Sequence, residues 1–308
     1  MARRRKPKQR GVSPLLVFVI GIALGWIGFA VLHRPATRHR AHPPVPPVAL
    51  ATVAPTPAAI ESALPTPEIG ATAAPTELPT PAISAVPIAG THRLAIIIDD
   101  CGQWPAVEHG MIALPIPITL SIMPDARYTH AIERAAADAD KGIMLHLPMQ
   151  PIGPLDPGPG KITTAMSDDA IVAQTEADLA RVPLARGVNN HEGSKATADP
   201  RVMRAVISVL AKDHRFFIDS KTIGDSVAEQ TAKDAGVPTA ARDVFLDNRA
   251  DVAYTQKMLE DAAKVAMANG SAIAIGHPRP TTLAAIRAMI PTLEAEGITF
   301  TLAQNLVQ

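Results

Sequence analysis

Between His92 and Gln308, short apolar runs alternate with longer Ala-rich or amphipathic segments. The apolar runs have the length of strands, and the segments between them have the length and composition of helices. This alternation predicts a parallel sheet with covering helices, either open or closed into a barrel. The expected strands lie within 94–102, 116–122, 142–151, 186–194, 216–222, 241–247, 271–280 and 298–302. The expected helices are 105–114, 128–140, 167–181, 200–212, 227–235, 254–269 and 282–295, with a long irregular loop over 152–166.

The first apolar run, Leu94 to Ile98, ends in two adjacent carboxylates, Asp99 and Asp100. An uninterrupted apolar run indicates a strand that is buried on both faces, as in a parallel sheet. The carboxyl end of such a strand is where α/β folds place their chemistry. Two neighbouring carboxylates repel each other, and a bound cation would remove that repulsion. The alternative interpretation is that one aspartate caps a following helix or turn.

Later strands also carry polar residues where their apolar runs stop. Because the carboxyl ends of parallel strands meet at one face, these side chains are expected to converge. Carboxylate and imidazole ligands suit Zn²⁺, Mn²⁺, Fe²⁺ or Co²⁺ better than Ca²⁺ or Mg²⁺. The single cysteine, Cys101, excludes an intrachain disulfide and is interpreted as a small buried filler rather than a nucleophile. The polar strand-end residues are Asp99, Asp100, His146, His191, Asp219, Asp247 and His277.

Six segments in order, IIIDDCG, MLHLPMQP, GVNNHEGS, FFIDSKT, VFLDN and AIGHPRP, resemble the divergent polysaccharide deacetylase family. The resemblance covers His92 to Gln308 and none of the preceding chain. It implies a distorted (β/α) barrel of about seven mainly parallel strands, as in the related NodB-type carbohydrate esterases. It also implies that Asp99 is a general base, that Asp100 binds a metal and that His277 is a general acid.

The resemblance further implies two histidines, four residues apart, as metal ligands. His146 matches the first of them, but Gln150 stands at the second position and is a poor ligand for a transition metal. His191, at the end of the next strand, is the residue that could supply the missing imidazole. The expected metal ligands are therefore Asp100, His146 and His191, and zinc is the first choice of divalent cation.

The activity that the resemblance implies is removal of acetyl groups from an N-acetylated envelope polysaccharide. Such amide hydrolysis needs an activated water, a polarised carbonyl and a proton for the leaving amine. The relatives' Arg-Pro-Pro-Tyr type motif has no clear counterpart here, because Asn189-Asn190-His191 stands in its place. One alternative is a weak or inactive barrel that binds glycan or an envelope partner, and another is hydrolysis of a different ester or amide. The candidate substrate-binding residues are Asn190, Ser194, Asp219, Ser220 and Thr222.

The N-terminal part of the chain has a different composition. Residues 1–13 are basic, and residues 14–32 form an uncharged stretch close to the roughly 20 residues that span a bilayer. This pattern predicts a single-pass anchor in a bacterial inner membrane, with the domain 92–308 in the periplasm. A cleaved signal peptide is the alternative. Residues 33–91, rich in Pro, Ala and Thr, are expected to form a disordered linker. The basic excess is confined to the N-terminus, so nothing indicates nucleic-acid binding.

Overall fold

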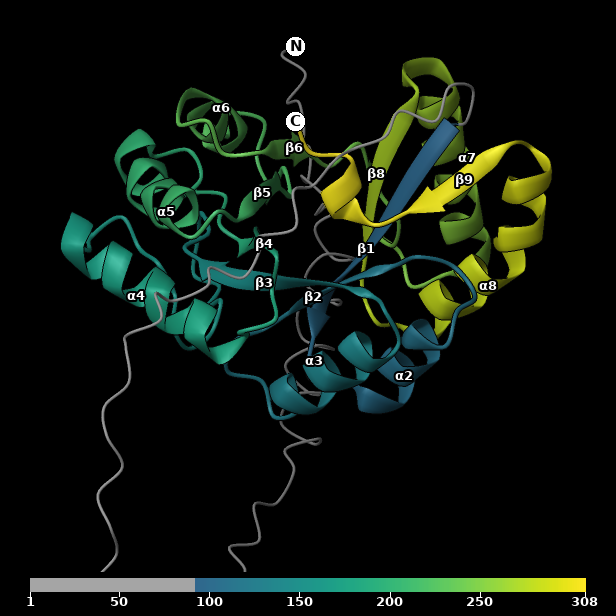
Figure 1. Ribbon diagram of the computed structural model, residues 1–308, viewed down its shortest axis with the longest axis horizontal. Helices are drawn as coiled ribbons and strands as arrows, with labels where there is room; N and C mark the ends of the chain where they lie inside the picture. Colours follow the sequence, from purple (N-terminus) through teal and green to yellow (C-terminus); the bar gives the residue numbers. More distant parts are fainter. Residues whose placement is uncertain (1–91) are drawn as a thin grey trace, which may run out of the picture. The chain divides into compact units, whose positions relative to one another are not determined.

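The computed structural model describes residues 92–308, which contain nine strands connected mainly by helices (Figure 1). The interpretations of residues 1–13, 14–32 and 33–91 concern positions outside this described range. Among residues 92–308, no helix combines the length and apolar character needed to cross a membrane. The strands are β1 (His92–Cys101), β2 (Thr119–Ile122), β3 (Gly142–Met149), β4 (Gly187–Glu192), β5 (Phe216–Asp219), β6 (Thr239–Ala241), β7 (Val244–Phe245), β8 (Ser271–Gly276) and β9 (Ile298–Thr301).

The sheet curls into a barrel whose two edges are not joined by a strand ladder. Its order is β6-β5-β4-β3-β2-β1-β8-β7, with every pair parallel, and β9 pairs with the first residues of β1. The edge strands β6 and β7 are consecutive in sequence, separated only by Arg242 and Asp243. A connection this short keeps Ala241 and Val244 within about 11 Å of each other, so the sheet must bend until its edges approach. The expected distorted parallel barrel is confirmed in this form.

One strand assignment from the sequence was wrong. The segment 241–247 was expected to be a single strand, but the structure has two short strands with different partners: β6 pairs with β5, and β7 pairs with β8. The change of partner occurs at Asp243. Its backbone N–H donates to the carbonyl of Ile273 at 2.9 Å, and its Oδ2 accepts from the N–H of Ile273 at 2.8 Å. The chain therefore leaves one edge of the sheet and joins the other within two residues.

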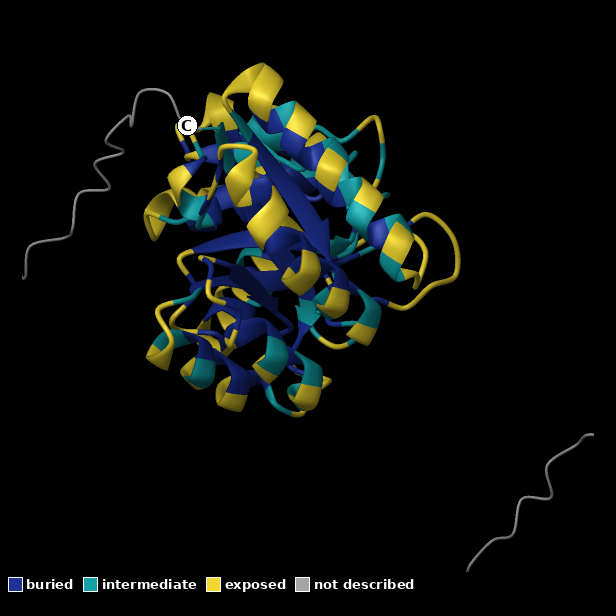
Figure 2. Ribbon diagram, turned by 90° about the vertical axis from the view of Figure 1, so that its right-hand side faces the viewer, coloured by how far each residue is buried: buried dark blue, intermediate teal, exposed yellow. Residues whose placement is uncertain are grey.

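Seven helices lie on the outside of the curled sheet in the described range. Figure 2 shows that their outer turns are exposed while the strands are buried. Helix ends follow local rules: Ser167 Oγ accepts the N–H of Ala170 at 3.3 Å, and Gly270 ends a helix with φ of 84°. The helices are α2 (Pro105–Ile112), α3 (Thr129–Asp138), α4 (Asp168–Arg181), α5 (Pro200–Lys212), α6 (Ala228–Asp234), α7 (Val252–Asn269) and α8 (Pro280–Ala295).

The barrel interior changes character along the strands. Side chains alternate between the helix-covered face and the interior. The interior positions near the amino ends form a small apolar core, which Ala303 and Leu306 from the C-terminal segment complete. Toward the carboxyl ends, the next interior position is polar in three strands: Ile97 is followed by Asp99, Met144 by His146, and Ile275 by His277. The interior is therefore apolar at one end and polar and titratable at the other.

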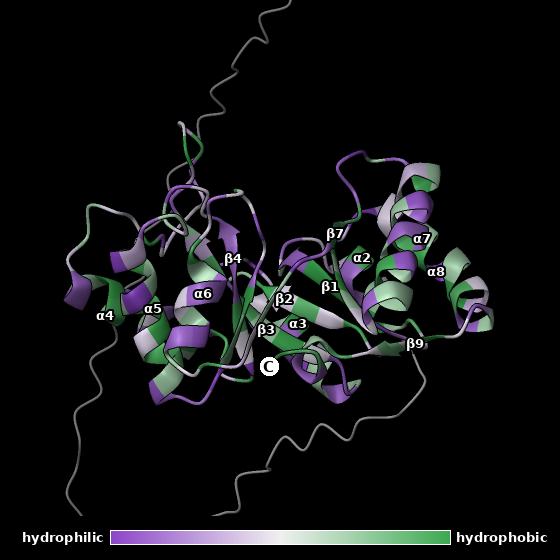
Figure 3. Cartoon of the chain, turned by 90° about the horizontal axis from the view of Figure 1, so that it is seen from above, coloured by the Kyte–Doolittle hydropathy of each residue, from purple (hydrophilic) through white to green (hydrophobic). Residues whose placement is uncertain are grey.

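Strand β4 differs from its neighbours in hydropathy. Figure 3 colours much of β1, β2 and β3 as hydrophobic, whereas β4 is largely hydrophilic. It lies between β3 and β5, and it ends in Asn189, Asn190, His191 and Glu192. Burying polar groups costs free energy unless they are hydrogen-bonded, so a polar strand inside a sheet indicates a functional requirement.

Candidate functional site

A β-bulge places the two adjacent aspartates together. Asp99 and Asp100 of β1 stand opposite the single β2 residue Ser121, and Asp100 has a left-handed backbone with φ of 56°. In a regular strand, consecutive side chains point to opposite faces, and an extra residue with left-handed backbone changes that alternation. Both carboxylates can therefore approach the same histidine, His146. The aspartates were expected just after the strand, but β1 continues through them to Cys101.

Three potential ligands converge from three strands. Asp100 Oδ1 lies 2.9 Å from His191 Nδ1 and 3.2 Å from His146 Nε2, and the two imidazole nitrogens are 3.1 Å apart. All three atoms lie within 4.8 Å of one another. The residues come from β1, β3 and β4, which explains why they are distant in sequence. The convergence expected from the strand order is present, and the role of these residues as metal ligands stays a prediction.

This donor set fits a divalent cation. Asp100 Oδ1 is buried and makes no hydrogen bond of acceptable geometry, although two imidazole nitrogens lie beside it. His146 Nδ1 lies 2.8 Å from the side-chain oxygen of Asn189, which places the proton on Nδ1 and leaves Nε2 free to act as a ligand. Two imidazoles and one carboxylate, with room for a water molecule, match the donor chemistry of catalytic zinc sites.

The charges of the cluster are strongly coupled. Burial raises the pKa of Asp100, but the neighbouring imidazoles of His146 and His191 outweigh it and lower that pKa well below its usual range. Burial lowers the pKa of His146, but Asp99 and Asp100 raise it to about 9. Without a cation the cluster therefore holds a proton on an imidazole. A metal ion would displace that proton, because ligating histidines must be neutral.

Asp99 lies beside the three-atom group rather than within it. Its Oδ1 accepts from Asn189 Nδ2 at 2.8 Å, and its Oδ2 is 3.7 Å from His146 Nε2. Burial raises its pKa, which suits a proton acceptor. Asn189 was not among the predicted site residues, although it also contacts Ser121 and Ser220. Strand alternation would have identified it, because Asn189 and His191 share one face of β4 and Asn190 points to the other.

His277, the residue directly after β8, also faces Asp100. Its Nε2 is 3.8 Å from Asp100 Oδ2, and its Nδ1 is 2.9 Å from Asp247 Oδ1. Asp247 is fully buried, and its Oδ2 accepts from the backbone N–H of His277 and from Thr282 Oγ1. Burial lowers the pKa of His277, but Asp247, Asp99 and Asp100 outweigh it and raise that pKa above its ordinary value. Asp247 was noted as a polar strand-end residue, but its partnership with His277 was not predicted.

Two of the predicted substrate-binding residues, Asn190 and Asp219, are buried. Asn190 is buried, with its Oδ1 accepting from the N–H of Ser220 and its Nδ2 donating to the carbonyl of Glu192. Asp219 is also buried, and its Oδ1 accepts from the N–H of Lys221. These two side chains tie neighbouring loops together and do not join the cluster around Asp100. Because both side chains are buried, almost no surface of theirs is open to a substrate, and their role in binding substrate stays a prediction.

The three hydroxyl residues predicted to bind substrate also have internal partners. Ser220 Oγ accepts from Asn189 Nδ2 at 3.1 Å, on the interior face of the barrel. Ser194 Oγ accepts from the N–H of Ile152 at 2.8 Å, and Thr222 Oγ1 donates to the carbonyl of Glu192 at 2.9 Å. Only the side chain of Thr222 belongs to an exposed residue. Their role in substrate binding stays a prediction.

Gln150 does not turn toward the candidate ligands. Its Oε1 accepts from the backbone N–H and the hydroxyl of Thr164, at 3.0 and 3.1 Å. It therefore fastens the long loop 152–166 to the end of β3. The buried thiol of Cys101 is equally remote from catalysis, since burial and nearby carboxylates raise its pKa well above the ordinary value.

Comparisons with known proteins agree with this architecture. A family model described as divergent polysaccharide deacetylase matches residues 96–307. An uncharacterized protein of Haemophilus influenzae is 39% identical over 201 residues, covering 65% of this chain and 72% of that protein. The uncharacterized protein YibQ of Escherichia coli is 34% identical over 226 residues, covering 73% and 70%. The crystal structure of uncharacterized protein ATU2773 from Agrobacterium tumefaciens shares the fold, with a TM-score of 0.68 at 23% identity over 70% of this chain and 89% of that chain.

Proposed function

This chain belongs to the divergent polysaccharide deacetylase family, and from that premise we propose that it is a metal-dependent hydrolase that deacetylates an N-acetylated envelope polysaccharide. The observation that carries this proposal is the convergence of Asp100, His146 and His191 within 4.8 Å. Asp99 lies 3.7 Å from His146, and His277 lies 3.8 Å from Asp100. Three ligands with an acid and a base beside them are what hydrolysis of an amide requires.

Asp99 is proposed as the general base. Asp100, His146 and His191 would hold a divalent cation, which would supply Lewis-acid activation of a water molecule and of the acetyl carbonyl. The raised pKa of Asp99 makes its carboxylate a better proton acceptor than an exposed aspartate. The hydrogen bond from Asn189 leaves Asp99 Oδ2 on the side of His146. Asp99 then takes one proton from the water molecule while the water oxygen attacks the acetyl carbon.

His277 is proposed as the general acid. Cleavage of the carbon–nitrogen bond requires a proton on the departing amine, because an amide anion is a very poor leaving group. The raised pKa of His277 favours the protonated form of its imidazole, which is the form that a general acid needs. Asp247 fixes the ring through Nδ1, so Nε2 points toward Asp100 with the transferable proton. The products are acetate and a free amino group on the sugar.

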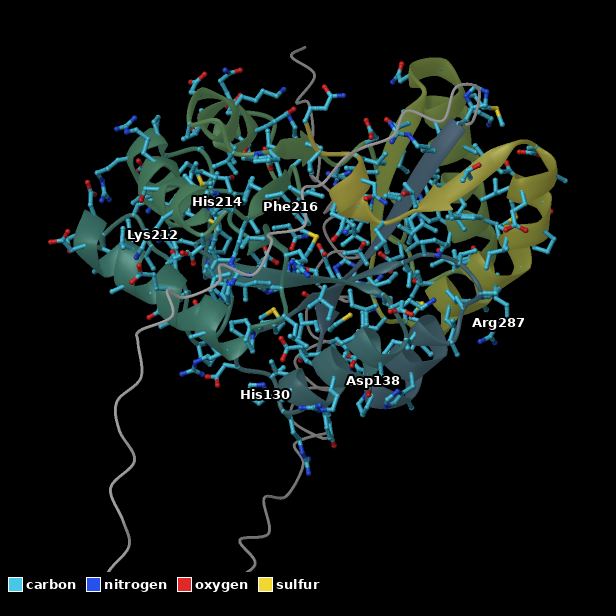
Figure 4. The ribbon with its side chains drawn as sticks, in the orientation of Figure 1. His130, Asp138, Lys212, His214, Phe216 and Arg287 are labelled. Carbon is cyan, nitrogen blue, oxygen red and sulfur yellow. The ribbon has the colours of Figure 1, made fainter. Side chains whose placement is uncertain are left out.

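Metal analysis combined with acetate release tests the proposal on the full-length chain. We expect bound zinc or another divalent metal, acetate release from N-acetylated glycans, loss of activity with a chelator and recovery with Zn²⁺. His191→Ala is expected to lower metal content and reduce turnover about a thousandfold, because several kcal/mol of charge stabilisation are lost. The matched control is His130→Ala, since His130 is 77% exposed on α3 (Figure 4). Full activity of a metal-free protein would overturn the proposal.

A glycan-binding barrel without hydrolysis is the competing function. It is favoured by Gln150, whose side chain is hydrogen-bonded to Thr164 and offers no ligand to the cluster. The same preparation separates the two functions. Binding of N-acetylated glycans without acetate release, at full metal occupancy, would establish the competing function.

The site of action is proposed from the N-terminal sequence alone. The basic residues 1–13 and uncharged residues 14–32 support an inner-membrane anchor with the barrel in the periplasm. Alkaline phosphatase fused after Gln308 is expected to be active, because that enzyme requires an oxidising compartment. An inactive but stably expressed fusion would contradict this orientation.

A further inference from the structure

Trp104 is an exposed aromatic residue at the edge of the candidate site that the proposed chemistry does not use. It is 48% exposed, and it follows Asp100 by only four positions. It lines a cavity of about 420 Å³ together with Val107, Asp100 and His277. Aromatic side chains that line a cavity together with a few polar groups are typical of ligand-binding pockets.

The backbone of Trp104 is held rigidly by Glu108. This glutamate is fully buried in α2, and its Oε1 accepts three consecutive backbone N–H groups, from Gly102, Gln103 and Trp104, at 3.0, 3.0 and 2.8 Å. Three hydrogen bonds to one charged oxygen are strong and define the path of the 102–104 loop. The tryptophan is therefore presented from a fixed loop, which lowers the entropy cost of binding a ligand.

The 102–104 loop contributes to the lining of two cavities that each reach a candidate ligand. The cavity of Trp104 reaches Asp100 and His277, and a second cavity of about 260 Å³ reaches Gln103 and His191. A substrate that fills both cavities contacts two of the candidate ligands, Asp100 and His191. Two cavities next to the cluster suit several linked units of a chain better than a single sugar.

We propose that Trp104 is a stacking platform for a pyranose ring of the glycan chain, next to the sugar held at Asp100 and His277. The inference rests on the proposed function of that site. A pyranose ring has a face of C–H groups that matches the face of an indole, while its hydroxyls point to the edges. Pro278 and Pro280 extend the apolar wall, and Arg279, whose side chain is 41% exposed, offers donors to hydroxyls. Glu108 is the positioning residue for this platform.

Tryptophan fluorescence tests the contact directly, because the chain has only one other tryptophan, Trp26. In a full-length Trp26→Phe background, we expect the emission of Trp104 to shift or be quenched by the tetramer of β-1,4-linked N-acetylglucosamine and by soluble peptidoglycan fragments. The N-acetylglucosamine monomer is expected to bind at least tenfold more weakly. No response to either oligomeric probe would overturn the inference.

Kinetics test the same contact independently of fluorescence. Trp104→Ala is expected to raise the KM for the tetramer about tenfold and to change kcat by less than about threefold, with Trp104→Tyr restoring most of the affinity. Glu108→Ala should raise KM similarly, and Glu108→Gln should retain affinity because its amide oxygen still accepts hydrogen bonds. The control Leu184→Ala removes a side chain of equal exposure, 48%, that lines a different cavity together with Gly142 and Arg186. Unchanged KM in Trp104→Ala would overturn the inference.

The two proposals fail in distinguishable ways. A fluorescence response without acetate release retains the platform and removes the hydrolase. Acetate release from the tetramer with neither a fluorescence response nor a KM effect retains the hydrolase and removes the platform.

Discussion

The two ends of the barrel interior both border cavities, but their chemistry differs. At the amino ends of β3, β4 and β5 lies a cavity of about 600 Å³, larger than the cavity of about 420 Å³ beside Asp100 and His277. At the amino end, Lys141 Nζ donates to the carbonyls of Leu114 and Ile116, both at 2.8 Å. There the ammonium group of Lys141 stabilises the turn that precedes β2.

At the carboxyl end, opposite charges converge from four strands and shift one another's pKa values. Asp100 has a lowered pKa and His146 a raised one, and Asp100 Oδ1 lacks a hydrogen bond although it is buried. Such an arrangement costs stability unless a ligand uses it. Cavity size therefore does not locate the site in this molecule. The convergence of buried titratable groups does.

Among the substitutions that compare the two ends of the barrel interior, Asp99→Asn at the carboxyl end is expected to have the largest effect on acetate release. The amide keeps the shape of the side chain and its acceptor for Asn189, but it cannot take a proton. We expect kcat for acetate release to fall about 10²–10⁴-fold with metal content unchanged. Asp140→Asn, at the amino-end cavity, is the matched control and should have no effect on kcat. Equal losses in both variants, or none in Asp99→Asn, would contradict the assignment of the base.

A smaller effect on rate with a change in pH profile is expected from Asp247→Asn. His277 acts in its protonated form, so activity is lost as pH rises through its pKa. Asp247 helps to raise that pKa, and removing its charge should lower it. We expect the basic limb of the kcat profile to move about one pH unit toward acid, with about a tenfold loss at its plateau. Thr282→Val removes a hydrogen bond to the same carboxylate but keeps its charge, so it should move the limb less. An unmoved limb in Asp247→Asn would remove His277 as the acid.

The smallest effect is expected at the amino end, from Lys141→Met. The substitution keeps the aliphatic stem and removes the two hydrogen bonds to Leu114 and Ile116. We expect the free energy of unfolding to fall by about 1 kcal/mol, which corresponds to about 2–4 °C in Tm for a domain of this size. Acetate release per folded molecule should not change. Arg186→Ala, an exposed neighbour in the same cavity, should stay within about 0.5 kcal/mol of the wild type. Loss of activity without loss of stability would assign a function to this end.

Local patterns in the sequence were sufficient for most of the strands, for the helices and for the polar residues at the strand ends. Apolar runs indicated β1, β3 and β8, and the Ser167 cap marked the start of α4, because hydrophobic burial and capping depend on neighbouring residues. The order of the strands was enough to predict that Asp100, His146 and His191 would meet, since parallel strands end at a common face.

Only the tertiary structure decided which face each polar side chain occupies. The bulge at Asp99 and Asp100 depends on the pairing of β1 with β2, and no local signal marks it. Asn189 and Asp247 became site residues through partners 43 and 30 positions away, His146 and His277. The separation of β6 from β7 arises because the curled sheet offers the chain a second edge. Contacts of this kind depend on the packing of the whole barrel, whereas the sequence by itself determined the elements that are packed.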